Sequence, residues 1–276
     1  MTLSERNIFF KAGIALCFVV TLLIMAVSSF IVPIYPEIET NIRRPEYLFQ
    51  FVSGWFLGSD YYAVHASLIL AVVFSFVGTL LIHNFFERTS APEILYISFF
   101  TLSFSFEVIR LILPLHLIYN FPSSYLLGAS RVLLFARYFS ITSLFTASVC
   151  AAGLEVQKTR NVIFFMVIAV LLIILGIPVD TEIWDTSFVM FNGYSSMFRM
   201  IEAAMFITTA ITFFIAAKVR DSREYVYVGI GVILALIGRN ILIGTDNWAG
   251  PVPGIFLLSF GTWFICSRLH KIHLWL

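Results

Sequence analysis

Eight apolar stretches, each long enough to cross a lipid bilayer, follow one another along the chain with short segments between them. A hydrocarbon core of about 30 Å requires roughly 20 helical residues, because each residue rises about 1.5 Å. Charged residues make up only 12% of the chain, whereas soluble domains carry about 25%. The sequence therefore predicts an all-α integral membrane protein with a single transmembrane domain, whose spans are residues 12–34, 62–84, 93–115, 130–152, 161–179, 197–217, 224–244 and 252–268.

The distribution of Lys and Arg between the connecting segments predicts the orientation. These residues favour the cytoplasmic side when they lie in short loops. With the N-terminus inside, the outer segments hold only Arg43 and Arg44. The cytoplasmic segments hold ten basic residues: Arg6, Lys11, Arg88, Lys158, Arg160, Lys218, Arg220, Arg223, Arg268 and Lys271. This split predicts that both termini are cytoplasmic and supports the count of eight, since removing one span would mix the two groups.

One further apolar segment is too short to span. Residues 45–58 are rich in aromatic side chains, and we expect them to form an amphipathic helix or lid at the outer interface. The lipid bilayer is thus the main expected partner, and the composition is that of a multi-pass protein of a bacterial-type cytoplasmic (inner) membrane. The charge pattern has no feature typical of a nucleic-acid-binding surface.

Four of the eight stretches carry charged residues within them. A charge near the centre of a bilayer costs about 2.5–3.5 kcal/mol on insertion scales, so such residues are candidates for function. At about 1.5 Å per residue they all lie in the outer half of the membrane, at depths of about 8–12 Å for the deepest. They are Glu107 and Arg110 in the third span, Arg131 and Arg137 in the fourth, Arg199 and Glu202 in the sixth, and Arg239 with Asn240 in the seventh.

Two of these spans carry a similar pair. The third reads Phe106-Glu107-Val108-Ile109-Arg110, and the sixth reads Phe198-Arg199-Met200-Ile201-Glu202. The two helices cross the membrane in opposite directions, so in both the glutamate is deeper and the arginine nearer the outer face. A spacing of three residues places each pair on one side of its helix.

The buried charges are mostly positive, with five arginines against two glutamates. One interpretation is that the third, fourth, sixth and seventh spans surround an outward-opening polar cavity, where an anionic ligand offsets the surplus, because Arg suits carboxylate and phosphate groups. Another is that Asp180, Glu182, Asp185 and Asp246 in the outer loops neutralise it. A third is that the ion pairs only hold helices together. Arg131, near the span edge, is expected to extend its long side chain to water.

The sequence gives little support for a haem, a metal site or a catalytic nucleophile. His65 and His116 lie near the outer ends of neighbouring spans, and we interpret them as interfacial rather than as haem or metal ligands. The three cysteines, Cys17, Cys150 and Cys266, are far apart and lack metal-ligand spacing. No nucleophile motif is present. We therefore expect no metal and no cofactor.

Three functions remain open. The first is a sensor-like or transport-like module that binds an anionic small molecule or lipid headgroup through Arg110, Arg137, Arg199, Arg239 and Asn240, with Glu107 and Glu202 orienting the arginines. The second is an enzyme acting on a lipid or lipid-linked substrate at the outer leaflet, with Glu107 or Glu202 as general base. The third is a non-catalytic subunit or scaffold, with a protein partner in the membrane. The sequence does not decide whether the protein is an enzyme.

Overall fold

The computed structural model describes residues 3–34, 58–86, 91–153, 159–185 and 187–274. The expected interfacial segment 45–58 lies outside these residues except for Gly58. In chain order the elements are α1 (Leu3–Ile31), η1 (Val32–Ile34), α3 (Tyr61–Phe86), α4 (Pro92–Ser103), η2 (Phe104–Leu111), α5 (Ile112–Tyr119), α6 (Ser123–Ala151), α7 (Thr159–Leu175), β1 (Val179–Trp184), β2 (Met190–Asn192), α8 (Ser195–Val219), α9 (Glu224–Gly244) and α10 (Pro251–Leu274).

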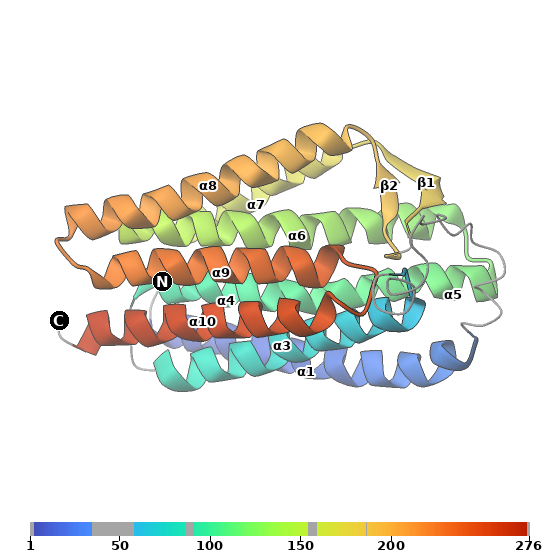
Figure 1. Cartoon of the computed structure of the whole chain (residues 1–276), viewed down its shortest axis with the longest axis horizontal. Coiled ribbons are helices and arrows are strands. Elements are labelled where there is room, and N and C mark those ends of the chain that lie inside the picture. The colour runs from blue at the N-terminus through green and yellow to red at the C-terminus, as the bar shows by residue number, and fades with distance from the viewer. Residues whose placement is uncertain (1–2, 35–57, 87–90, 154–158, 186, 275–276) are drawn as a thin grey trace.

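The helices form one elongated bundle with two distinct ends (Figure 1). The N- and C-terminal labels lie toward one end, which we call the terminal end. Strands β1 and β2 lie at the opposite end, which we call the hairpin end. Helix α8 leans away from α9 toward the hairpin end, although a short turn joins the two helices at the terminal end.

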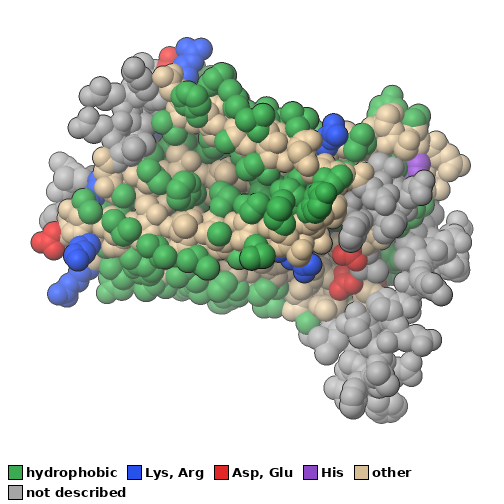
Figure 2. Space-filling view, turned by 90° about the horizontal axis from the view of Figure 1, so that it is seen from above, with side chains coloured by type: hydrophobic (Ala, Val, Ile, Leu, Met, Phe, Trp, Pro, Cys, Tyr) green, Lys and Arg blue, Asp and Glu red, His purple; other side chains and the backbone are tan. Residues whose placement is uncertain are grey.

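Seven helical segments in the described part of the chain are long and apolar enough to cross a membrane: Ser4–Ile31, Tyr61–Phe86, Pro92–Tyr119, Ser123–Ala151, Ser195–Val219, Glu224–Gly244 and Pro251–Ile272. The predicted span 161–179 instead contains a shorter apolar helix, Arg160–Leu175. Figure 1 shows that α7 runs back along the bundle to the hairpin end, so its path is that of a further crossing, but the count of eight stays a prediction. Hydrophobic side chains cover much of the face seen in Figure 2.

Polar contacts tie the helix ends together at the terminal end. Arg6 Nη2 donates to the carbonyl of Phe86 at 2.9 Å. Arg220 lies 3.9 Å from Glu93, and Arg268 lies 3.2 Å from Glu224. These basic residues belong to the group that predicted the cytoplasmic side, so the structure gathers them at one end of the bundle.

Helices α9 and α10 pack most closely because glycines line their contact. A Cβ atom on Gly238 would overlap the main-chain nitrogen of Leu258, and one on Gly261 would lie 2.6 Å from the nitrogen of Ala235. Gly231 and Gly254 are similarly enclosed by the facing helix. Small residues allow two membrane helices to approach until their backbones touch. This contact fixes one side of α9, and Arg239 follows directly after Gly238.

The third predicted span is not a continuous α-helix. Its middle, η2, is a 3₁₀ helix of eight residues that contains both Glu107 and Arg110, whereas such helices are usually limited to three or four residues. Pro114 supplies a reason, because a proline has no N–H and its ring clashes with the carbonyl four residues earlier, here that of Arg110. Ser75 and Ser105 also donate to the carbonyl of Leu102, just before η2.

The chain is helical as expected, with one addition: β1 (Val179–Trp184) and β2 (Met190–Asn192) form a short antiparallel β-hairpin. Val179 pairs with Asn192, and Trp184 pairs with Met190. The fifth predicted span, drawn to residue 179, ends as helix at Leu175. Gly176 and Pro178, which commonly follow the end of a helix, stand between α7 and β1, whereas the span was drawn from apolar length alone.

The tip of the hairpin inserts into the bundle. Phe188 is 3% exposed and its ring stacks on Tyr61, with the ring centroids 5.4 Å apart. It packs in a hydrophobic cluster that includes Val64 and Leu111. Its φ of 58° lies in the left-handed region, which is unusual for a bulky residue. The hairpin is thus a fixed part of this end of the bundle.

Candidate functional site

The carboxylate of Glu107 forms the centre of a buried ion-pair cluster. Its Oε1 accepts a hydrogen bond from Arg137 Nε, and its Oε2 accepts one from Arg137 Nη2, each at 2.8 Å. Arg110 Nη1, one turn away on η2, lies 3.5 Å from the same Oε2. The Glu107 side chain is only 2% exposed. This two-pronged arrangement between an arginine and a carboxylate is among the strongest side-chain hydrogen bonds in proteins.

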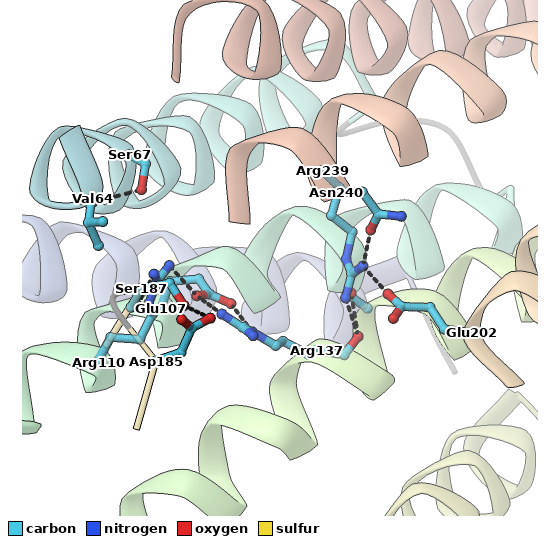
Figure 3. Close-up of polar contacts among 11 residues, drawn as sticks. Val64, Ser67, Glu107, Arg110, Arg137, Asp185, Ser187, Glu202, Arg239 and Asn240 are labelled. Atoms are coloured by element: carbon cyan, nitrogen blue, oxygen red, sulfur yellow. Dashed lines mark hydrogen bonds and ion pairs between the residues drawn. The ribbon is translucent and has the colours of Figure 1, made fainter. Parts of the chain in front are cut away.

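Arg110 connects this cluster to the hairpin. Its Nε and Nη2 both donate to the carbonyl oxygen of Ser187, the former at 2.8 Å. Asp185 is close enough to Arg110 to interact with it electrostatically, and Figure 3 draws the two together. The hydroxyl of Ser187 also donates to Asp185 Oδ2 at 3.4 Å. The turn of the hairpin is therefore held by a buried guanidinium from the third span.

Arg239 is the centre of a second cluster. Its Nη1 donates to Glu202 Oε1 at 2.6 Å and to Asn240 Oδ1 at 2.9 Å. Its Nε donates to the hydroxyl of Ser140 at 3.2 Å, and its Nη2 donates to the carbonyl of Arg137 at 3.1 Å. Helices α6, α8 and α9 are thus linked by one side chain. All of its nitrogens are engaged, as a buried guanidinium requires.

The two clusters are adjacent, as Figure 3 shows, because Arg137 belongs to both. Its guanidinium faces Glu107, while its main-chain carbonyl accepts from Arg239. A continuous polar path therefore runs from Ser187 in the hairpin through Arg110, Glu107 and Arg137 to Arg239 and Glu202. The four spans in which the sequence places charges therefore meet here.

A cavity of about 510 Å³ adjoins the second cluster, within the range of about 300–1,000 Å³ that small-molecule sites occupy. Helices α6, α8 and α9 supply most of its wall, and the hairpin region adds Ile177 and Asn192. Its polar lining comprises Arg137, Tyr138, Asn192, Ser195, Arg199, Glu202, Arg239 and Asn240, and its apolar lining comprises Leu134, Ile141, Ile177, Phe198, Ala203, Phe206, Ile243 and Gly244.

The candidate residues divide into two groups relative to this cavity. Arg137, Arg199, Glu202, Arg239 and Asn240 line it. The other two, Glu107 and Arg110, are brought into the same polar network but lie behind Arg137, away from the cavity wall. Of the nitrogens of Arg199, only Nε has a hydrogen bond within the described chain, to the carbonyl of Ser195 at 3.4 Å. Glu202 pairs with Arg239 of α9 rather than with Arg199 on its own helix.

Several contributors have no signal in the sequence. The Ser140 hydroxyl and the carbonyls of Arg137 and Ser187 accept from the buried arginines, but a serine in a helix and a main-chain oxygen occur everywhere. Phe206, whose ring centroid lies 5.9 Å from the Arg239 guanidinium carbon, is one of 30 phenylalanines. Its spacing of four residues from Glu202 was the one available indication.

The histidines and cysteines do not assemble into a metal site. Over the residues that the structure describes, no three His, Cys, Asp or Glu side chains lie together in a way that would hold an ion. His65 is buried within the protein near the start of α3, and its Nε2 lies 2.7 Å from the hydroxyl of Ser28. The contact joins α1 to α3.

Comparison with protein-family models, with curated proteins and with solved structures finds no match to this chain. The class of protein therefore follows from the fold itself. Among the described residues, seven helices are long and apolar enough to cross a membrane, which defines a multi-pass helical membrane protein. Near one end of the bundle the protein buries two linked clusters of arginine and glutamate.

Proposed function

We propose that this protein binds the anionic group of a small molecule or lipid headgroup in the cavity between α6, α8 and α9, on the outer side of a bacterial-type inner membrane. The observation that carries the proposal is the lining of that cavity, where three arginines, Arg137, Arg199 and Arg239, converge with one glutamate. Three arginines around one space of ligand size make a strong anion-binding environment.

The balance of charges indicates which arginine is available. Glu107 offsets Arg137, Glu202 offsets Arg239, and Asp185 lies near Arg110. This leaves Arg199, the most exposed of the four, without an acidic partner within the described chain. The surplus that the sequence predicts is thus partly met by an acidic loop residue, and one positive charge remains for a ligand at the cavity.

An enzymatic role has weaker support. A general base needs an oxygen that faces the substrate, and both oxygens of Glu107 accept from arginines. Glu202 keeps one oxygen unengaged among the described residues, but no metal-binding group of side chains accompanies it there. A ligand-binding module, sensor-like or transport-like, fits these contacts better than catalysis does.

Ligand-induced thermal stabilisation tests the proposal. The purified protein in detergent would be heated with a panel of anionic metabolites and lipids, and a ligand at about 100 times its Kd should add about 2.7 kcal/mol of stability. Arg199→Gln should abolish the shift, whereas the matched variant Arg131→Gln, on α6 but outside the cavity lining, should retain it. The proposal fails if nothing in the panel stabilises the protein, or if Arg199→Gln responds like the unmodified chain.

A further inference from the structure

On the cavity wall, α8 carries one positively and one negatively charged side chain, and each has polar atoms without a hydrogen-bond partner among the described residues. Neither Nη1 nor Nη2 of Arg199 has a hydrogen-bond partner within the described part of the chain, and only its Nε is engaged. Glu202 gives Oε1 to Arg239, while its Oε2 has no partner there and the side chain is 27% exposed. Residues three apart lie on one side of a helix with Cβ atoms about 5–6 Å apart, so a free donor lies one turn from a free acceptor.

Asn240 adds a second donor from the neighbouring helix. Its Oδ1 accepts from Arg239 Nη1 at 2.9 Å, which orients the side-chain amide. The Nδ2 group, which carries two N–H donors, is left without a partner among the described residues, and the side chain is exposed at the cavity wall. Two helices therefore present donors for an anion, and Glu202 presents an acceptor beside them.

A ligand with a single charge would satisfy only part of this arrangement. An anion alone would bind near Arg199 but would leave the second oxygen of Glu202 beside it, where like charges repel. A cation alone would meet Glu202 but also the guanidinium of Arg239, 2.6 Å from the other oxygen of that carboxylate. A molecule that carries both charges satisfies the donors and the acceptor together.

We infer that the ligand is a zwitterion, with a primary ammonium group that donates to Glu202 Oε2 and a carboxylate or phosphate that accepts from Arg199 and Asn240. The apolar lining at Leu134, Ile177, Phe198 and Ile243 then receives an uncharged hydrocarbon part. This inference rests on the proposed function and adds the ammonium group. The same chemistry occurs in a free amino acid with an apolar side chain and in the headgroup of an aminophospholipid.

Matched ligands test the inference on the unmodified protein. For a free zwitterion, the probes are leucine, 4-methylpentanoate, which lacks the ammonium group, and 3-methylbutylamine, which lacks the carboxylate, each titrated against the protein in detergent by calorimetry. For a lipid source, the protein would be placed in nanodiscs containing phosphatidylethanolamine or phosphatidylglycerol, and retained lipid would be measured by native mass spectrometry. In at least one of the two experiments, the ligand that carries both charges, leucine or phosphatidylethanolamine, should bind about tenfold more tightly than each probe that lacks one of them.

Variants assign the effect to Glu202. Glu202→Gln should bring the affinity for the ammonium-bearing ligand to within about threefold of that for the plain anion, because a carboxamide removes the charge that the ammonium meets. Glu224→Gln, which alters an ion-paired glutamate at the terminal end, should change neither affinity.

The ammonium contact and the proposed binding of an anion are contradicted by different results. If 4-methylpentanoate and phosphatidylglycerol bind as tightly as leucine and phosphatidylethanolamine, the ammonium contact is wrong and anion binding stands. If only 3-methylbutylamine binds, the proposed function fails and the inference fails with it. If no probe in either arm binds, the zwitterion inference fails, and the panel of anionic metabolites and lipids decides the proposed function. The comparison among ligands needs no variant, so a poorly folded Glu202→Gln protein would not prevent a decision.

Discussion

Arg239 donates a hydrogen bond from Nη2 to the main-chain carbonyl of Arg137, at 3.1 Å. The buried Arg239 and the partly buried Arg137 thus lie next to each other without sharing a carboxylate, because Arg137 accepts through its main-chain carbonyl and keeps its guanidinium for Glu107. The contact lies where α6 meets α9, between two ion-pair clusters that the sequence places on four separate spans. Its geometry makes the stability of the two clusters interdependent.

The two buried glutamates should differ in what their removal costs. Glu107 is 2% exposed and serves two arginines, whereas Glu202 is 27% exposed and serves one. Glu107→Gln leaves buried guanidinium groups without a counter-charge, a change that typically costs about 3–5 kcal/mol. Glu202→Gln should cost clearly less, because the Glu202 side chain is 27% exposed and pairs with one arginine instead of two. Thermal unfolding in detergent compares them, and equal losses would contradict this account of the clusters.

Arg110 should control the stability of the hairpin. Arg110→Met keeps a long side chain but removes both hydrogen bonds to the carbonyl of Ser187. Amide hydrogen exchange across residues 179–192 should then accelerate by about tenfold or more, since a hydrogen bond to a charged group contributes about 1.5–3 kcal/mol. Arg131→Gln serves as the control and should leave the exchange unchanged. Unaltered exchange in Arg110→Met would show that Phe188 alone anchors the hairpin.

The contact between α9 and α10 should not tolerate a side chain at Gly238. Gly238→Ala places a methyl group against the backbone of Leu258, and overpacking of this kind typically costs about 1–3 kcal/mol. Gly128→Ala on α6 is the matched control, because nothing lies within 4 Å of its added Cβ. There the substitution should stabilise by about 0.5–1 kcal/mol through helix propensity. A neutral Gly238→Ala would mean that the two helices pack less closely.

Cysteine labelling decides whether α7 crosses the membrane. In a background that lacks Cys17, Cys150 and Cys266, single cysteines at Arg160 and Gly176 would be treated with a membrane-impermeant maleimide on intact cells. If α7 spans and the terminal end is cytoplasmic, Gly176→Cys reacts and Arg160→Cys reacts only after the membrane is opened. The reverse pattern would invert the orientation, and labelling of both from one side would remove the eighth span.

Much of the fold follows from local properties of the sequence. The length of each apolar stretch identifies the spanning helices, because crossing the bilayer requires about 20 consecutive, mostly apolar residues. The 3₁₀ segment in the third span was harder to predict from the sequence. Pro114 and the serines near Leu102 can be read there, but many membrane helices contain proline without changing to a 3₁₀ helix. The hairpin was missed because the acidic segment after Gly176 and Pro178 resembles an ordinary outer loop, and nothing in it identifies two paired strands.

Apolar composition is enough to identify a membrane protein, and the positions of the charged residues within the spans are enough to select the candidate site, since burying each charge without a partner is costly. How those charges pair follows from the packing of the helices. Glu202 pairs across the bundle with Arg239 rather than along its own helix with Arg199, because α8 and α9 pack together with these side chains facing. Pairing depends on which helix faces lie in contact, and helix rotation is a property of packing that no single span encodes.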